Sequence, residues 1–123
     1  MLQPLAIVFY ERLLPGSQLV NRLQDLNYRV LAFNNPGLLA ATARRELPLV
    51  AFVDLDAQGD VCGEIKQIKT DAATAHLPVV AFAPENRPEL LDAGQKAGAS
   101  LVVGETNLGD HLEQLLEQAL RVD

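Results

Sequence analysis

The chain has 123 residues, of which 49% are hydrophobic, and it carries a formal net charge of -6 and one cysteine. This length predicts a single domain over residues 1–123, and the lone cysteine excludes an intrachain disulfide. The negative charge, with no dense cluster of Lys and Arg, argues against nucleic acid as a partner, and no apolar run is long enough to span a membrane, so we expect a cytoplasmic protein.

Five short apolar runs predict five buried strands. They cover residues 5–10, 28–33, 49–53, 79–83 and 99–103. A continuous apolar run that is closed by turn residues is typical of a strand buried on both faces. The third run ends abruptly in carboxylates, Asp54 and Asp56, which makes its end the first candidate for a functional site.

A helix is predicted after each of these runs. The first begins after the Pro-Gly-Ser turn at residues 15–17, and the second begins at Asn35, which precedes a proline. Asp60 is the expected cap of the third helix, and Gly98 ends the fourth. Residues 104–109 are expected to form a loop before the last helix. That helix carries an apolar stripe at helical spacing, made of Leu112, Leu115, Leu116, Ala119 and Leu120.

Alternating strands and helices predict an α/β fold, a flavodoxin-like, doubly wound parallel sheet of five strands with order 2-1-3-4-5 and five helices. In that order the first and third strands are neighbours, so their carboxyl ends bring Glu11 and Asp54 close together. Ligands of such sheets bind beyond the carboxyl ends of the strands. We therefore expect the functional site there.

Several stretches resemble the receiver domain of bacterial two-component response regulators, the CheY-like family, over essentially the whole chain. They are the acid Glu11 after the first strand, FVDLD with Asp54 at its centre, HLPVVAFA, and AGAS before the fifth strand. The resemblance implies that Asp54 is a phosphoacceptor for a histidine kinase. It also implies a weak Mg²⁺ site at Glu11, Asp54 and Asp56, because Mg²⁺ prefers carboxylate oxygens.

The sequence departs from that family at four positions of the implied site. Ala83 replaces the switch Thr or Ser, Gly104 replaces the Lys, Tyr10 replaces a second acid, and Glu105 replaces a Pro. These changes predict that the site lacks one fixed positive charge and one hydroxyl that would otherwise hold a phosphoryl group. The resemblance therefore implies a degenerate or atypical receiver.

Three functions remain open on the sequence alone. The first is a stand-alone response-regulator receiver-like signalling domain of a phosphorelay, which is not an enzyme. The alternative is a pseudo-receiver, a phosphorylation-independent protein–protein interaction or dimerisation module, with a homodimer formed through helix 4, strand 5 and helix 5. The third is a flavodoxin-like enzyme or cofactor binder, which the sequence ERLL at residues 11–14 disfavours because no phosphate-cradling loop follows the first strand.

Overall fold

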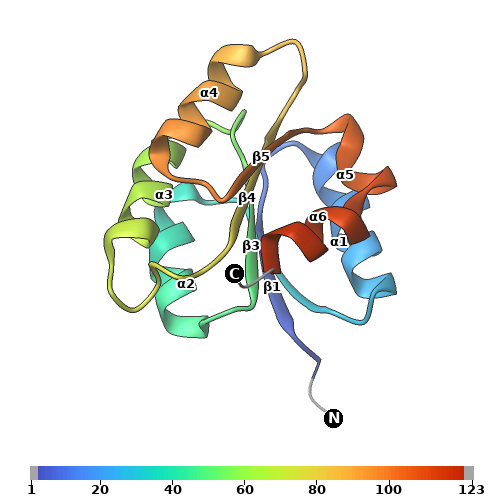
Figure 1. Cartoon of the computed structure of the whole chain (residues 1–123), viewed down its shortest axis with the longest axis horizontal. Coiled ribbons are helices and arrows are strands. Elements are labelled where there is room, and N and C mark those ends of the chain that lie inside the picture. Colours follow the sequence, from blue (N-terminus) through green and yellow to red (C-terminus); the bar gives the residue numbers. More distant parts are fainter. Residues whose placement is uncertain (1–2, 121–123) are drawn as a thin grey trace.

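A computed structural model describes residues 3–120 of the chain. Its centre is a parallel sheet of five strands with the order β2-β1-β3-β4-β5, as predicted (Figure 1). The strands are β1 (Leu5–Phe9), β2 (Arg29–Phe33), β3 (Val50–Asp54), β4 (Val79–Ala83) and β5 (Leu101–Gly104). In register, Phe9 of β1 lies beside Val53 of β3, and Ala83 of β4 lies beside Gly104 of β5.

The helices cover both faces of this sheet. They are α1 (Leu13–Asp25), η1 (Pro36–Leu38, a 3₁₀ turn), α2 (Leu39–Glu46), α3 (Val61–Thr70), α4 (Pro88–Ala97), α5 (Thr106–Asp110) and α6 (Leu112–Leu120). Helices α2, α3 and α4 lie on one face, and α1, α5 and α6 lie on the other (Figure 1). Within residues 3–120, none of these helices is long and apolar enough to cross a membrane.

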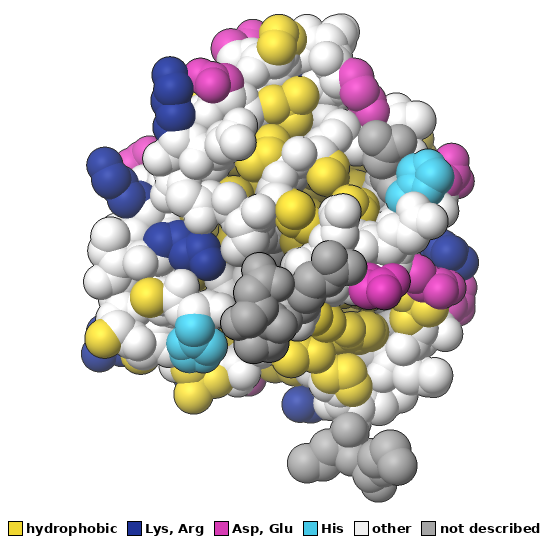
Figure 2. All heavy atoms as spheres, viewed as in Figure 1, with side chains coloured by type: hydrophobic (Ala, Val, Ile, Leu, Met, Phe, Trp, Pro, Cys, Tyr) yellow, Lys and Arg dark blue, Asp and Glu magenta, His cyan; other side chains and the backbone are white. Residues whose placement is uncertain are grey.

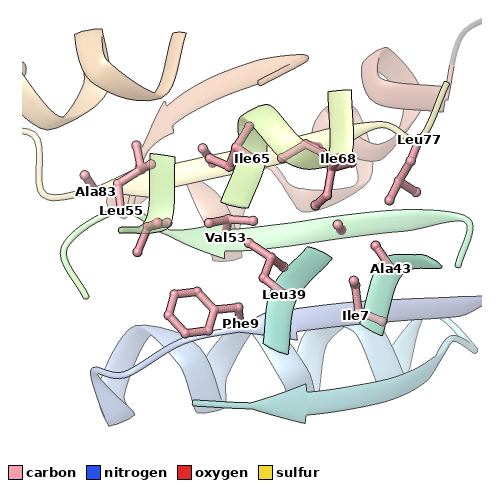
Figure 3. Packing of buried hydrophobic residues seen from close by; sticks show 14 residues of the cluster. Ile7, Phe9, Leu39, Ala43, Val53, Leu55, Ile65, Ile68, Leu77 and Ala83 are labelled. Carbon is pink, nitrogen blue, oxygen red and sulfur yellow. The ribbon is translucent and has the colours of Figure 1, made fainter. Parts of the chain in front are cut away.

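Two apolar layers hold the helices on the sheet. Successive strand residues point to opposite faces, so Ile7 packs under α2 and α3 whereas Val8 packs under α1 and α6. In the first layer, Leu39 of α2 and Ile65 of α3 are fully buried against the sheet (Figure 3). Burying each such side chain contributes about 1.5–3 kcal/mol. This double coverage explains the continuous apolar runs of β1, β3 and β4, whereas the edge strands β2 and β5, which were also predicted to be buried, are only partly buried.

The predicted helix signals are confirmed at three places. The Asn35 side chain accepts a hydrogen bond from the Gly37 amide at 3.0 Å, just before the turn of η1. Asp60 accepts one from the Gly63 amide at 3.1 Å and caps α3. Gly98 ends α4 with a φ of 108°, which a residue with a Cβ rarely adopts.

The prediction that the first helix starts after residues 15–17 is wrong. Helix α1 begins at Leu13, and Pro15 lies in its first turn. The first amides of a helix have no partner within it, so a proline is tolerated there without loss of a hydrogen bond. The earlier start places the helix N-terminus, with Arg12 directly before it, at the carboxyl edge of the sheet.

The prediction of five helices and a loop at residues 104–109 is also wrong. Within residues 3–120 there are six α-helices, because α5 (Thr106–Asp110) precedes α6 and is separated from it at His111. The carboxylate of Glu85 accepts hydrogen bonds from the backbone amide and the hydroxyl of Thr106, at 3.0 and 2.9 Å. Because these bonds satisfy a first-turn amide, they stabilise a helix start that local sequence did not reveal.

Candidate functional site

Asp54 is the last residue of β3 and lies at the carboxyl edge of the sheet, between β1 and β4. Its side chain is on the same face as those of Val50 and Phe52, because side chains alternate along a strand. That face is covered by α1, so the carboxylate points toward the N-terminus of this helix. Asp54 has no exposed surface, which means that its charge requires partners inside the protein.

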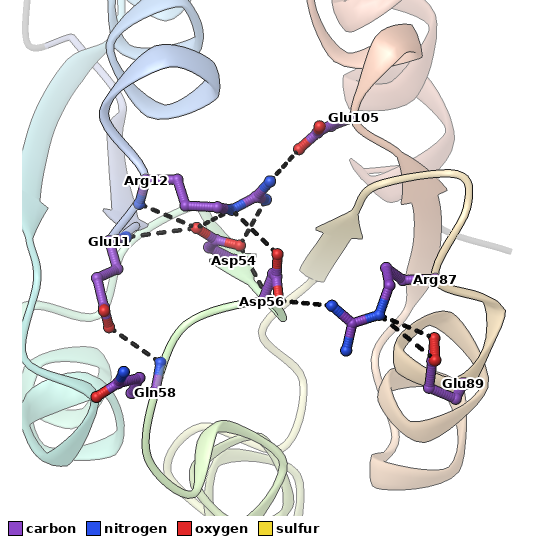
Figure 4. A network of polar contacts seen from close by, with 8 residues as sticks. All are labelled: Glu11, Arg12, Asp54, Asp56, Gln58, Arg87, Glu89 and Glu105. Carbon is purple, nitrogen blue, oxygen red and sulfur yellow. Dashed lines mark hydrogen bonds and ion pairs between the residues drawn. The ribbon is translucent and has the colours of Figure 1, made fainter.

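The partners of Asp54 come mainly from the turn that joins β1 to α1. The guanidinium of Arg12 forms a bidentate contact: Nη2 donates to Oδ1 at 2.8 Å, and Nε donates to Oδ2 at 3.3 Å. The backbone amides of Glu11 and Arg12 also donate to Oδ2, each at 3.4 Å, and the Asp56 amide donates to Oδ1 at 3.0 Å. Both oxygens of Asp54 are therefore occupied (Figure 4).

The same guanidinium meets two further carboxylates. Its Nε lies 3.8 Å from Asp56 Oδ2, and its Nη1 lies 2.6 Å from Glu105 Oε2. The Glu105 contact is an ion pair by distance, but within the described residues no donor is well directed at this buried oxygen. Burial alone lowers the pKa of Arg12, whereas the hydrogen bonds with Asp54 and the negative charges of Asp54 and Glu105 outweigh it and raise that pKa. Arg12 is thus the shared cation of three carboxylates.

A second arginine extends the network to the loop before α4. Arg87 Nη1 lies 3.5 Å from Asp56 Oδ1, and its Nε donates to Glu89 at 3.2 Å (Figure 4). The side chain of Arg87 is 46% exposed, so this pair is screened by solvent more than the contact of Arg12 with Asp54. The loops after β1, β3, β4 and β5 are nevertheless connected by one charged network.

Glu11 takes a different direction from the one expected of a metal ligand. Its backbone amide lies against Asp54, as the predicted strand order requires, but its carboxylate accepts a hydrogen bond from the Gln58 amide at 3.0 Å. Within residues 3–120 no group of three or more Asp, Glu, His or Cys residues is arranged to hold a metal ion. As placed, Glu11, Asp54 and Asp56 do not fit Mg²⁺, because a guanidinium contacts two of them and the third faces away.

The two predicted switch positions lie at the ends of β4 and β5. Ala83 is fully buried, and Gly104 is its neighbour in register. A Cβ at Gly104 would collide with the carboxylate group of Glu85, so the glycine leaves room for that side chain to reach Thr106. The hydrogen bonds that Glu85 receives from its own amide and from Thr106 lower its pKa. Beside the two positions at which the resemblance implied a lost switch, Glu85 and Thr106 form a structural contact.

Reasoning from the sequence missed Arg12, Arg87 and the pair of Glu85 with Thr106. It also predicted that one fixed positive charge was absent from the site, and Arg12 corrects this expectation because it brings a guanidinium from the β1–α1 turn. The signal was in the sequence: Arg12 directly follows Glu11 at a strand end that had already been assigned to the same edge. Arg12 is neither an acid nor at a position that the resemblance assigns to the site, so neither line of reasoning selected it.

Comparisons with known proteins agree with this architecture. No protein-family model and no curated protein matches the sequence. Among solved structures, the receiver domain of the sensor histidine kinase PA1611 from Pseudomonas aeruginosa, which has a magnesium ion in its active-site cleft, gives a TM-score of 0.87 at 13% identity, covering 97% of this chain and 98% of that one. The NtrX receiver domain from Brucella abortus gives 0.81 at 18% identity, with 96% and 99% covered.

A third similar structure is the chemotaxis response regulator CheY4 of Vibrio cholerae, with a TM-score of 0.76 at 16% identity and coverage of 93% of this chain and 99% of that one. Identities at this level establish the fold and not the activity. The chain has the CheY-like receiver fold, and the predicted resemblance is confirmed at the level of the fold.

Proposed function

We propose that this protein is a receiver-like signalling domain that acts by binding a protein partner and whose Asp54 is not a phosphoacceptor in the resting structure. One observation carries the proposal: the guanidinium of Arg12 engages both oxygens of Asp54, at 2.8 and 3.3 Å. In this reading the domain is cytoplasmic, has no catalytic role and uses neither nucleic acid nor a membrane as its partner.

The chemistry of phosphoryl transfer supports this reading. An acceptor oxygen must be free to attack in line, and cations must absorb the charge that develops on the phosphoryl group. Asp54 is fully buried, and both its oxygens already accept hydrogen bonds. Transfer to it would first require the Arg12 side chain to leave.

Switching also needs contacts that differ between the two states. A ligand or modification shifts an equilibrium only through such differential contacts. Ala83 offers no hydroxyl and Gly104 no ammonium group to hold a phosphoryl oxygen. Phosphorylation of Asp54 would therefore form few new contacts that could shift the conformation of the domain. A partner-binding surface that does not change shape is the simpler function for these residues.

The second candidate is a phosphoaccepting receiver of a phosphorelay with a histidine kinase as partner. The position of Asp54 at the end of β3 favours it, and the two arginines near Asp56 are groups that bind phosphoryl oxygens well. In this case Mg²⁺ would bind weakly at Glu11, Asp54 and Asp56 after Arg12 has moved away.

A labelling experiment separates the two candidates. The purified protein is incubated with Mg²⁺ and acetyl phosphate, and then analysed by intact-mass spectrometry and by borohydride trapping of any acyl phosphate. The proposal predicts no adduct above that of the D54A variant, with a competent receiver domain as the positive control. An adduct in the wild-type protein that D54A abolishes would establish the phosphoaccepting function instead.

The partner surface that we favour consists of α4, β5 and the α5–α6 segment, which corresponds to the predicted helix 4, strand 5 and helix 5. Apolar side chains are visible over β5 between α4 and α5 (Figure 2). Strand β5 is an edge strand, and its residues are only half-buried in this chain. A second copy of the chain is one occupant of this surface, and another signalling protein is the other.

Sedimentation over a range of concentrations tests the dimer. We expect a concentration-dependent dimer in the wild-type protein that the V102E variant weakens. A matched control is A32E, which places the same charge on the edge strand at the other end of the sheet, where Ala32 is exposed. If both variants and the wild-type protein sediment as the same monomer, the second copy is not the partner.

A further inference from the structure

The cluster around Arg12 is arranged as a cation site whose cation belongs to the chain itself. Carboxylates from the end of β3 and from the loops after β3 and β5 converge on this one guanidinium: Asp54 at 2.8 Å, Asp56 at 3.8 Å and Glu105 at 2.6 Å. Asp54 has no exposed surface, and the contacting oxygen of Glu105 is buried without a well-directed donor. The Glu105 oxygen is therefore neutralised by proximity to the guanidinium, whereas both oxygens of Asp54 also accept directed hydrogen bonds.

The backbone holds the guanidinium in place. The amides of Glu11 and Arg12 both donate to Asp54, so the turn that carries the arginine is docked on the same carboxylate that its side chain contacts. A tethered group has a high effective concentration at a site within its reach. A free divalent ion has to compete with this internal cation for the same oxygens.

The two cations cannot share the site. Mg²⁺ requires near-octahedral oxygen ligands at about 2.0–2.1 Å and retains several waters, so it needs carboxylate oxygens that are not already bound to a guanidinium. The Glu11 side chain, which the resemblance implied as a ligand, is held by the Gln58 amide instead. The mismatch between the implied metal and the residues present thus has two causes: Arg12 occupies Asp54 and Asp56, and the Gln58 amide holds Glu11.

We propose that Arg12 is a built-in counter-ion that excludes divalent cations from Asp54 and Asp56, an autoinhibitory contact in which the guanidinium occupies the carboxylate oxygens that the implied Mg²⁺ would need. The proposal deepens the proposed function, on which it rests for the statement that the resting site is closed. It assigns the closure to one side chain.

The experiment measures Mn²⁺ binding by electron paramagnetic resonance and calorimetry, in the absence of any phosphodonor. We expect R12Q to bind Mn²⁺ at least about tenfold more tightly than the wild-type protein. The control R22Q removes an exposed arginine whose Nε donates to the Gly109 carbonyl, and it should bind Mn²⁺ as the wild-type protein does. The double variant R12Q/E105Q should lose part of the gain, because it also removes the negative charge that Glu105 places beside Arg12.

Two further measurements cover a variant that folds poorly. If R12Q is unfolded without metal, Mn²⁺ should restore its circular dichroism spectrum, and failure to do so contradicts the proposal. R12K keeps the charge but loses the bidentate contact with Asp54, so its Mn²⁺ affinity should lie between those of the wild-type protein and R12Q. Equal affinity in the wild-type protein, R12K and R12Q would overturn the proposal.

The outcome is separable from that of the labelling experiment. Tight Mn²⁺ binding by the wild-type protein without any phosphoryl adduct would refute the role of Arg12 and leave the proposed function standing. Labelling of Asp54 in a wild-type protein that binds no Mn²⁺ on its own would refute the proposed function and leave the exclusion of the free cation intact.

Discussion

The carboxyl edge of the sheet has two halves that handle charge differently. In the half at β1 and β3, a fully buried carboxylate, Asp54, is retained and matched by Arg12. In the half at β4 and β5, Ala83 and Gly104 carry no polar side-chain group. Glu85 and Thr106 pair there at the surface, and Glu105 and Arg87 reach across to the charges of the first half. A buried charge persists in a protein only with a partner, so the first half depends on one ion pair and the second does not.

The largest effect is expected from breaking that ion pair. R12A leaves Asp54 buried without a cation, and we expect it to lower the free energy of unfolding by about 3 kcal/mol or more. Urea titration followed by circular dichroism measures this loss, with R22A as the exposed control. In the double variant R12A/D54A the loss should be smaller than the sum of the two single losses, because the charge left unpaired is gone. Additive losses would mean that the two residues do not act as a pair.

The next effect tests the apolar half by returning a polar group to it. A83T adds a methyl and a hydroxyl group to a fully buried position, and we expect it to cost about 1–3 kcal/mol of unfolding free energy. A32T makes the same change at an exposed strand position and should be close to neutral. If A83T is as stable as the wild-type protein by urea titration, there is space for a hydroxyl side chain at this position. Both halves of the edge could then hold a buried polar group.

A smaller effect is expected at Glu85, and its sign depends on pH. The pKa of Glu85 is lowered by hydrogen bonds from its own amide and from Thr106, so the carboxylate form stabilises the fold above the ordinary Glu pKa of about 4.3 and loses this contribution as the pH falls through the lowered value. E85Q should therefore melt below the wild-type protein at neutral pH, and the gap should close in acid. E89Q is the control, and a gap that is independent of pH would exclude the carboxylate as its source.

The smallest effect is expected at Arg87, which contacts the charged half from the loop before α4. Its side chain is 46% exposed where it meets Asp56, so R87A should change the unfolding free energy by only about 0–1 kcal/mol, and salt should reduce the difference further. Melting curves at low and high salt measure this. If R87A lowers the free energy of unfolding as much as R12A does, and salt does not reduce the loss, the exposed and buried ion pairs act as one unit.

Most of the fold was predictable because it follows from local patterns. Five continuous apolar runs became five strands, and the caps at Asn35 and Asp60 and the stop at Gly98 lie where the sequence indicated. The start of α1 and the presence of α5 were not predictable. Both depend on the surroundings: α1 begins where the amides of Glu11 and Arg12 donate to Asp54, and α5 begins where Glu85, from another loop, reaches Thr106.

The candidate site was predictable in its position and not in its contacts. The strand order brings the backbone of Glu11 to Asp54, as expected from the sequence. The direction of the Glu11 carboxylate toward Gln58, and of the Arg12 guanidinium toward Asp54, depends on which loop groups lie within reach after folding. The roles of Asp54 as a phosphoacceptor and of Glu11 and Asp56 as metal ligands stay predictions for the labelling and Mn²⁺ experiments.

The sequence by itself determined the class of fold, the order of the strands and the edge at which the acidic residues gather, because apolar periodicity and turn residues act over a few neighbours in the chain. Only the tertiary structure decided which cation meets Asp54. Arg12 and Asp54 are 42 residues apart, and their pairing depends on the loops after β1, β3 and β5 being held together by the packed sheet. A long charged side chain pairs with whichever opposite charge lies within its reach in the folded protein, and local sequence patterns do not encode that proximity.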